Sequence, residues 1–193
     1  NNEVPDRSDM TTKFGIATIE YANTALGDLT SITGYKKFTL FEYTDQDGTA
    51  KTNNATRRRT KGDQFSQELR SSFELNDMIS GVAGVFSLKT DYNHYQMYHL
   101  DFALPGLIQY NVQDQSTESF SAFLQTYAKL SDRLKLSAGV RYTKDKINAR
   151  STLNTGLGSQ ALTATLWDTF DDVFPGSLDV GGKKSWSNVG WKV

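Results

Sequence analysis

The sequence contains no cysteine among its 193 residues. Thiol catalysis, disulfide bonds and cysteine-ligated zinc sites are therefore excluded. Apolar residues are also scarce, because only 37% of the chain is hydrophobic and the mean hydropathy is −0.52. A compact soluble domain of this length has a more apolar composition. We therefore expect something other than a conventional protein core to stabilise the fold.

Long apolar runs and an excess of one charge are absent too. A membrane-spanning helix needs a stretch of about 18 apolar residues, and the sequence has none. A spanning β-strand needs only about ten residues, every second one apolar. Lysine and arginine number 21, and aspartate and glutamate number 22, which gives no basis for binding nucleic acid. The chain begins Asn1-Asn2-Glu3 without a signal-peptide pattern, so we expect a mature protein or an internal part of a longer one.

A short unit of the form Leu-x-Asp recurs about every fifty residues. Asn, Asp and Gly tolerate the backbone angles of tight turns, so each unit predicts the turn of a β-hairpin. The three units are Leu26-Gly27-Asp28, Leu75-Asn76-Asp77 and Leu130-Ser131-Asp132. Alternating stretches on both sides of each unit predict three long hairpins and the start of a further strand, at about residues 13–43, 64–90, 119–147 and 185–193.

Period-two alternation assigns two faces to some of these strands. Between residues 64 and 75, one face carries Phe65, Leu69 and Phe73, and the opposite face is polar. We expect the polar face to line a water-filled lumen. The expected lumen-facing residues are Gln64, Glu68, Arg70 and Arg141. Both faces of 29–43 and 119–130 mix aromatic and polar residues, so the pattern assigns no facing there.

The predicted connections differ in length between the two ends of the strands. The turns inside the hairpins are minimal, whereas the links at about 44–62, 91–118 and 148–184 are long and polar. Short turns on one rim and long extracellular loops on the other are typical of outer-membrane barrels. The expected fold class is therefore all-β, an antiparallel meander of long hairpins forming part of a transmembrane β-barrel. The alternative is a soluble antiparallel sandwich whose aromatic residues form its core.

Six segments, in order along nearly the whole chain, resemble the barrel of TonB-dependent outer-membrane receptors. They read "LTSITGYKKF" (29–38), "DQDGT" (45–49), "QFSQELRSSF" (64–73), "VAGVFSLKTDY" (82–92), "ESFSAFLQTYAKLSDRLKLSAGVRYTKDK" (118–146) and "SWSNV" (185–189). The resemblance implies a bacterial outer-membrane importer, with a barrel of about 22 strands and a globular plug. It also implies an iron-siderophore type of ligand and energy supplied by TonB. The plug and the TonB-contacting segment are missing, so we expect residues 1–193 to be one partial barrel domain whose contact with TonB runs through the missing plug.

Candidate ligand contacts lie in the predicted long loops. His94 and His99 are the only histidines, and Tyr92, Tyr95 and Tyr98 lie beside them. In a regular strand the two histidines would point to opposite faces, and no carboxylate–histidine spacing indicates a metal site. We therefore expect no metal and no cofactor. The aromatic residues are expected either to contact an iron chelate or to lie at the membrane interface.

A cationic cluster of Arg57, Arg58 and Arg59 lies in the first predicted loop. Guanidinium groups bind anionic oxygens in a bidentate manner. The cluster is therefore expected to attract an anionic ferric complex or lipopolysaccharide phosphates, unless it is a solvated loop or the lumenal end of a strand paired with Glu68 and Asp63. Trp167 in the third predicted loop completes the candidate ligand contacts.

Two other functional classes remain open from the sequence. A small non-transport outer-membrane barrel could act as a structural or adhesive protein, and a soluble sandwich could bind sugars through Trp167, Trp186 or Trp191. No nucleophile elbow, phosphate-binding glycine loop or recognisable pair of catalytic carboxylates occurs, so we do not expect an enzyme. Outer-membrane lipid and lipopolysaccharide are the expected surroundings, a small iron-chelate molecule is the expected ligand, and no nucleic acid is expected to bind.

Overall fold

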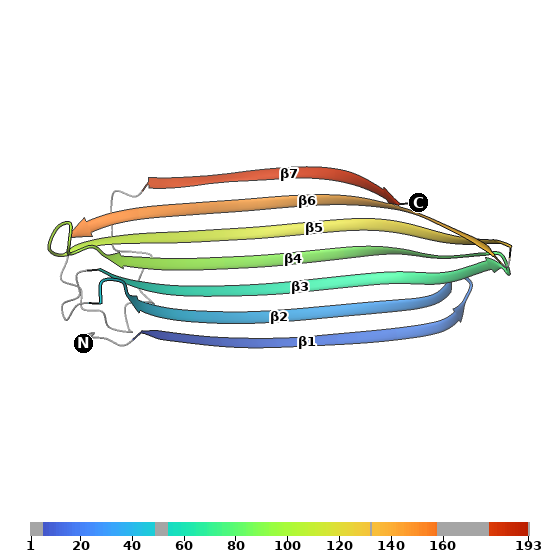
Figure 1. The fold of residues 1–193 in the computed structure, drawn as a ribbon, viewed down its shortest axis with the longest axis horizontal. Helices are drawn as coiled ribbons and strands as arrows, with labels where there is room; N and C mark the ends of the chain where they lie inside the picture. The colour runs from blue at the N-terminus through green and yellow to red at the C-terminus, as the bar shows by residue number, and fades with distance from the viewer. Residues whose placement is uncertain (1–5, 49–53, 132, 158–177, 193) are drawn as a thin grey trace.

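The computed structural model describes residues 6–48, 54–131, 133–157 and 178–192. Within these residues the chain forms one seven-stranded sheet in which every strand pairs with the next along the chain, and all pairs are antiparallel (Figure 1). The strands are β1 (Arg7–Thr24), β2 (Gly27–Asp45), β3 (Ala55–Asn76), β4 (Ile79–His99), β5 (Leu107–Ser131), β6 (Leu134–Leu157) and β7 (Leu178–Lys192). The predicted all-β antiparallel meander is confirmed.

Local side-chain hydrogen bonds stabilise the three short turns. Gly27 has φ +91°, in the left-handed region that favours glycine, so it can begin β2 directly after the first turn. In the second turn, Asn76 Oδ1 accepts hydrogen bonds from the backbone N–H groups of Met78 and Ile79, both at 2.9 Å. In the third turn, Ser131 Oγ accepts one from Leu134 N–H at 3.1 Å. The middle residue of each Leu-x-Asp unit therefore contributes directly to its turn.

The strands extend well into the ranges that the sequence assigns to loops. Residues 55–62, 91–99 and 107–118 all belong to strands, and the connection between β4 and β5 consists of residues 100–106. Polar side chains do not end a strand, because the backbone ladder and the neighbouring strands determine whether pairing continues. The predicted loops begin where the sequence becomes less hydrophobic, whereas the hydrogen bonds between the strands continue beyond those residues.

The register assigns every strand residue to one of two faces. We call them the Phe65 face and the Glu68 face, after two residues of β3. Tyr35 pairs directly with Phe65, and Leu124 pairs with Ala83, which in turn pairs with Ser71. Cross-strand partners share a face, so Tyr35 and Leu124 lie on the Phe65 face. The register thus assigns the faces of β2 and β5 that the sequence pattern left open.

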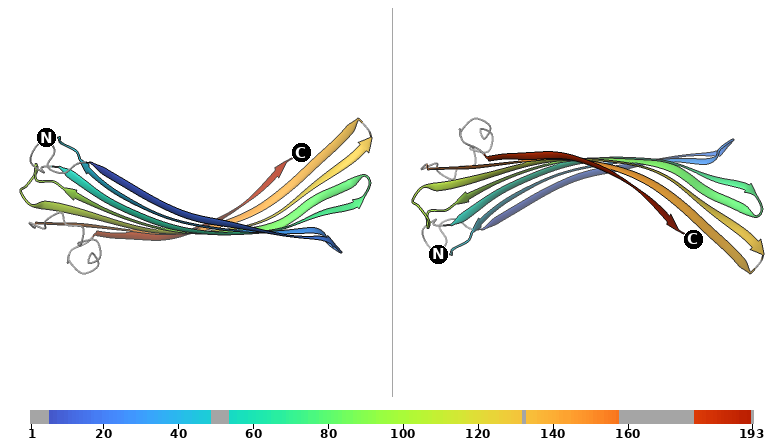
Figure 2. Two further views of the ribbon diagram at one scale, coloured as in Figure 1. Left: turned by 90° about the horizontal axis from the view of Figure 1, so that it is seen from below. Right: turned by 90° about the horizontal axis from the view of Figure 1, so that it is seen from above.

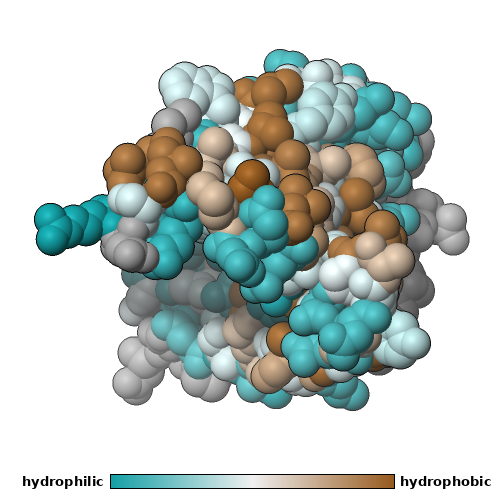
Figure 3. All heavy atoms as spheres, turned by 90° about the vertical axis from the view of Figure 1, so that its right-hand side faces the viewer, coloured by the Kyte–Doolittle hydropathy of each residue, from teal (hydrophilic) through white to brown (hydrophobic). Residues whose placement is uncertain are grey.

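The sheet is a single twisted layer (Figure 2). Among the described residues no helix and no second sheet lies against either face. Phe65 is 47% exposed and Leu69 is 48% exposed, although each is large enough to anchor a protein core. Figure 3, viewed from the short-turn end, shows hydrophobic residues gathered in patches between hydrophilic ones. Isolated in water, this sheet would leave a large apolar surface uncovered.

The Phe65 face carries an apolar band next to the short turns. In β3 the band contains Phe65, Leu69, Phe73 and Leu75. Counted from the short turn in each described strand, the first charged residues on this face are Lys13 in β1, Lys37 in β2, Asp63 in β3, Lys89 in β4, Glu118 in β5 and Lys144 in β6. The band therefore spans about ten residues of each strand, the length that crosses a bilayer at a tilt.

The Glu68 face has charges along the same stretch of the sheet. Arg70 and Glu68 of β3 and Lys36 of β2 lie there, beside Arg141 of β6. The four residues that the sequence predicts on the polar face, Gln64, Glu68, Arg70 and Arg141, therefore share one face. The charges of β2, β3 and β6 therefore make this face less suited to hydrocarbon than the Phe65 face, although β4 contributes Val82, Phe86 and Leu88 to it.

A glycine creates space for an aromatic ring on the Glu68 face. Gly84 of β4 pairs with Phe123 of β5, and Phe123 lies over it. A Cβ atom at Gly84 would lie 2.7 Å from the Phe123 ring and 2.8 Å from the backbone oxygen of Leu69. Both distances are too short, so the close packing of three strands at this point requires glycine.

We predict that Gly84→Ala destabilises the protein by about 1–3 kcal/mol, because the added methyl group overpacks the site. Gly139→Ala is the matched control, since a Cβ at Gly139 would have its nearest neighbour at an ordinary 3.5 Å. The free energy of unfolding of the full-length protein in lipid vesicles, measured with guanidinium chloride, checks the difference. Equal stability of the two variants would contradict the close approach described for Gly84.

Candidate functional site

A polar and aromatic surface covers the Glu68 face toward the long connections. We call it the amide–aromatic patch. Its members are Arg58 of β3, Tyr92, His94 and Tyr98 of β4, and Gln109, Asn111, Gln113 and Gln115 of β5. Period-two geometry places these side chains on the same face in three adjacent strands. The patch offers neutral hydrogen-bonding groups, aromatic rings and one guanidinium group.

Side-chain contacts hold the β3 and β4 part of the amide–aromatic patch. Thr60 Oγ1 is hydrogen-bonded to His94 Nδ1 at 2.9 Å, and the Tyr92 and His94 rings are parallel within 8° with centroids 6.1 Å apart. Arg58 Nη1 donates to Glu42 Oε2 of β2 at 3.2 Å. The Thr60 bond fixes the orientation of the imidazole, and the carboxylate of Glu42 positions the guanidinium group.

The amides of β5 were not identified as candidates from the sequence. Gln109, Asn111, Gln113 and Gln115 alternate with Tyr110, Val112 and Asp114. Its polarity predicts a loop, yet strict alternation of amides is itself a strand signal. Ser151 Oγ of β6 donates to Asn111 Oδ1 at 3.3 Å, so the polar surface continues into the next strand.

Closer to the short turns, the Glu68 face carries a row of arginine and aromatic residues. The cross-strand partners Arg70, Gly84, Phe123 and Arg141 lie side by side in β3 to β6. The Arg141 guanidinium lies 5.9 Å from the centre of the Phe123 ring and donates to Ser121 Oγ at 2.7 Å. Arg70 Nη1 lies 3.5 Å from Glu68 Oε1 in an ion pair. Cation–π contacts and ion pairs of this kind hold the long cationic side chains against the Glu68 face of the sheet.

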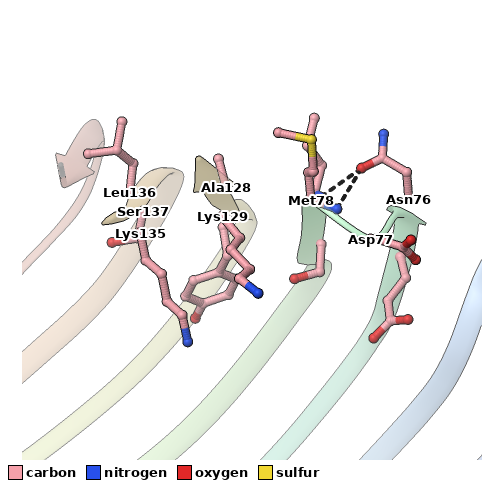
Figure 4. Close-up of a pocket in the computed structure, with 12 residues that line it drawn as sticks. Asn76, Asp77, Met78, Ala128, Lys129, Lys135, Leu136 and Ser137 are labelled. Atoms are coloured by element: carbon pink, nitrogen blue, oxygen red, sulfur yellow. Dashed lines mark hydrogen bonds between the residues drawn. The ribbon is translucent and has the colours of Figure 1, made fainter. Parts of the chain in front are cut away.

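A pocket lies on the Glu68 face at the short-turn rim (Figure 4). Glu74 and Asp77 line it from the β3–β4 hairpin, and Lys129 and Lys135 line it from the β5–β6 hairpin. In Figure 4, Lys135 extends to one side of the sheet while Leu136 extends to the other. The pocket therefore places two acidic and two basic side chains around one hollow, which suits a polar protein segment better than an apolar ligand.

The remaining candidate contacts lie on the opposite face. Arg57, Arg59, Tyr95 and His99 belong to the Phe65 face by register, so consecutive arginines of the cluster alternate between faces. The Arg59 guanidinium lies 4.9 Å from the centre of the Tyr95 ring. Arg57 and His99 are each only 7% exposed. Trp167 lies outside the described residues.

Arg57 and His99 lie near a small buried cluster of Met97, Ile108 and Tyr110. Burial lowers the pKa of the Arg57 guanidinium below its usual range. Burial is also the main cause of the lowered pKa of His99, assisted by the charge of Arg57 and opposed by Asp101. His99 Nε2 has no hydrogen-bond partner within the described ranges. These two side chains are therefore packed within the protein and do not face open solvent.

Residues 6–48, 54–131, 133–157 and 178–192 include no group of three or more His, Cys, Asp or Glu residues arranged to hold a metal ion. The same residues include no helix that is long and apolar enough to cross a membrane.

Comparison with known proteins gives a family match and a set of similar structures. The model of the family described as "TonB dependent receptor-like, beta-barrel" matches residues 2–190. The ferric yersiniabactin uptake receptor FyuA from Yersinia pestis superposes with a TM-score of 0.66 at 16% identity, over 96% of this chain and 25% of that one. The ferric-catecholate import receptor Fiu from E. coli K12, in its open form, superposes with a TM-score of 0.63 at 16% identity, over 96% of this chain and 33% of that one.

A more distant match is the RagAB peptide transporter, with a TM-score of 0.52 at 8% identity, over 95% of this chain and 26% of that one. No curated protein matches the chain. The chain thus spans about a quarter to a third of the length of these three structures. At identities this low, the superpositions establish the fold alone.

We predict that the region around His99 becomes less stable as the pH falls from 7 to 5. Its pKa lies below the ordinary value of 6.5 in the folded state. The locally unfolded state therefore binds a proton that the folded state does not bind. Stability is complete above the unfolded pKa and declines below it, by at most about 1.4 kcal/mol per pH unit.

Hydrogen exchange of amides in Met97–His99 of the full-length protein, corrected for intrinsic rates, measures this effect. Peptides from Leu134–Val140, which contain no histidine, provide the internal control. His99→Phe should abolish the pH dependence. Protection at 97–99 that stays constant or rises on acidification would contradict the burial of a neutral His99.

Proposed function

The chain belongs to the TonB-dependent receptor-like β-barrel family, and we propose that it is part of the wall of an outer-membrane receptor that imports a ferric siderophore-type ligand. Residues 1–193 form one partial barrel domain in this proposal, with the long connections on the extracellular side. Its sheet is a section of a transmembrane β-barrel, and the family is one of bacterial outer-membrane receptors and transporters.

The observation that carries the proposal is the difference between the two faces of a single-layer sheet. The Phe65 face carries an apolar band next to the short turns, and the Glu68 face carries charges at the same height. In a barrel, the first face would contact lipid and the second would line the lumen. Gln64, Glu68, Arg70 and Arg141 are therefore proposed as lumen-facing residues.

The amide–aromatic patch is the proposed ligand contact within the lumen. Amide, imidazole and phenol groups supply hydrogen bonds and ring surfaces, and the Arg58 guanidinium, positioned by Glu42, supplies further N–H donors for an anionic chelate. FyuA is a ferric yersiniabactin uptake receptor and Fiu is a ferric-catecholate import receptor, which supports a ligand of the same chemical class here. Of the three consecutive arginines, only Arg58 belongs to this patch.

The proposed partners follow from the two faces and the rim. TonB acts through a globular plug outside this chain, and the rim pocket with Glu74, Asp77, Lys129 and Lys135 is suited to contact such a plug. Outer-membrane lipid, including lipopolysaccharide, surrounds the Phe65 face. The sequence also allowed a small structural or adhesive barrel; the family match favours the receptor.

We predict that His94→Ala in the full-length receptor lowers uptake of its ferric ligand about three- to tenfold, because a positioned hydrogen-bonding ring is lost from the lumen. The neighbouring Asn93→Ala is the matched control, since Asn93 lies on the Phe65 face where it bonds to Asp114. Uptake of radioactive iron as ferric yersiniabactin and as a ferric catecholate, in iron-starved cells, provides the measurement.

Equal uptake by the two variants would remove the amide–aromatic patch from the binding site. Failure of the unmodified receptor to take up either complex would contradict the siderophore proposal, while leaving the barrel assignment in place.

A further inference from the structure

His99 is a buried histidine that takes no part in the proposed ligand contact. It is the last residue of β4, beyond the apolar band, and lies on the Phe65 face with only 7% of its surface exposed. Its ladder partners are Ala55 of β3 and Ile108 of β5, which have apolar side chains. Among the described residues no group is hydrogen-bonded to its Nε2 atom. Protonation would therefore bury a charged ring without an acceptor for its N–H group.

Two charged groups act on His99 from different elements. Arg57 of β3 lies diagonal to it on the same face and is equally buried. Asp101 belongs to the connection after β4, where its Oδ1 accepts a hydrogen bond from Gly106 N–H at 2.7 Å. Burial is the largest cause of the lowered pKa of His99, while Asp101 opposes this shift and Arg57 adds to it. The other titratable side chains nearby on this face are Tyr43 and Asp45 of β2 and Tyr110 of β5, and β6 contributes the neutral residues Asn154 and Gly156.

His99 is also directly connected to the amide–aromatic patch. Tyr98, the preceding residue, lies on the Glu68 face and belongs to the patch, and its ladder partner Gln109 is another member. The Tyr98–Gln109 pair is adjacent to the His99–Ile108 pair in the ladder. Opening of the ladder at His99 would therefore displace two groups of the proposed ligand contact.

Local hydrogen bonds close the end of the β4–β5 hairpin (Figure 1). Leu100 N–H donates to Leu107 O at 2.9 Å, and the bond between Asp101 and Gly106 crosses the same connection. Phe102 of this connection is 66% exposed, so it adds little packing. Strand ends of this kind open at a smaller free-energy cost than the centre of a sheet. The hairpin end can therefore open while the rest of the ladder stays paired.

We propose that His99 makes ligand binding at the amide–aromatic patch sensitive to protons. The patch is complete while His99 is neutral and buried, whereas protonation opens the end of the β4–β5 hairpin and displaces Tyr98 and Gln109. This inference rests on the proposed function and adds regulation to that site. Because binding equilibria are reciprocal, acid lowers the affinity for the ligand and bound ligand opposes protonation of His99.

Ligand affinity at two pH values tests the proposal. The measured quantity is the Kd of ferric yersiniabactin, and of a ferric catecholate, for the full-length receptor in lipid nanodiscs at pH 7.5 and 5.5. Relative to His99→Phe, which retains a ring but cannot be protonated, the unmodified receptor should lose about two- to fivefold more affinity at pH 5.5, because fewer molecules have a closed hairpin. His99→Leu gives the same comparison with a smaller apolar side chain, and heat-modifiable migration on gels checks that each variant forms a barrel.

Asp101→Asn gives a readout that a structural role alone would not change. The amide keeps an oxygen for the Gly106 N–H group but removes the negative charge that favours a protonated His99 in the closed hairpin. The loss of affinity at pH 5.5 should therefore increase by about twofold, without a comparable change at pH 7.5. Asp45→Asn is the matched control, since Asp45 also accepts backbone N–H groups but lies two strands from His99. Equal pH dependence of these two variants would contradict the role of His99.

Hydrogen exchange at Tyr98 and Gln109, corrected for intrinsic rates, measures the opening itself. Exchange should become faster between pH 7.5 and 5.5 in the unmodified receptor but not in His99→Phe, and a bound ferric complex should suppress the increase. Affinity that falls equally in the unmodified receptor and in His99→Phe would overturn the regulation and leave the proposed function in place. Binding of neither complex at either pH would overturn the proposed function, and the regulation with it.

Discussion

The backbone hydrogen-bond ladder is the constraint on which the rest of this structure depends. In hydrocarbon every N–H and C=O group must find a partner within the protein, and an antiparallel sheet supplies these partners continuously. The seven strands form one ladder with hardly any register shifts outside the hairpin turns. The strands β2 to β6 are paired on both sides, so hydrocarbon can cover this layer where a soluble sheet would need a second one. Hydrocarbon takes the place of a protein core, which accounts for the low apolar content of the chain.

Strict period two then determines on which of the two faces each side chain lies. Arg57, Arg58 and Arg59 are consecutive in sequence, yet only Arg58 shares a face with Tyr92 and His94. The same rule separates the amide–aromatic patch from Arg57, Arg59, Tyr95 and His99, although both sets include residues of β3 and β4. One sheet therefore presents a polar and aromatic surface on one side and an apolar band on the other, without a second element between the two.

Part of this organisation could be predicted from the sequence. The Leu-x-Asp units indicate the turns because Gly27, Asn76 and Ser131 have the required backbone or hydrogen-bonding properties. The faces of β3 are readable because Phe65 and Glu68 belong to sharply contrasting sets. In β2 and β5 both faces mix aromatic and polar residues, and only the register against β3 and β4 resolves them. The burial of Arg57 and His99 was not predictable, since it depends on packing with residues distant in the chain.

The central claim can be tested directly by placing a spin label at single cysteines introduced from Gln64 to Leu75 in the full-length protein in vesicles, after any cysteine elsewhere in that protein has been replaced. Relaxation by oxygen, which concentrates in hydrocarbon, should be strong at positions 65, 69 and 73. Relaxation by a water-soluble nickel complex should be strong at 64, 68 and 70. Equal accessibility of both sets to the nickel complex, or oxygen maxima at the even-numbered positions, would contradict a lipid-covered Phe65 face.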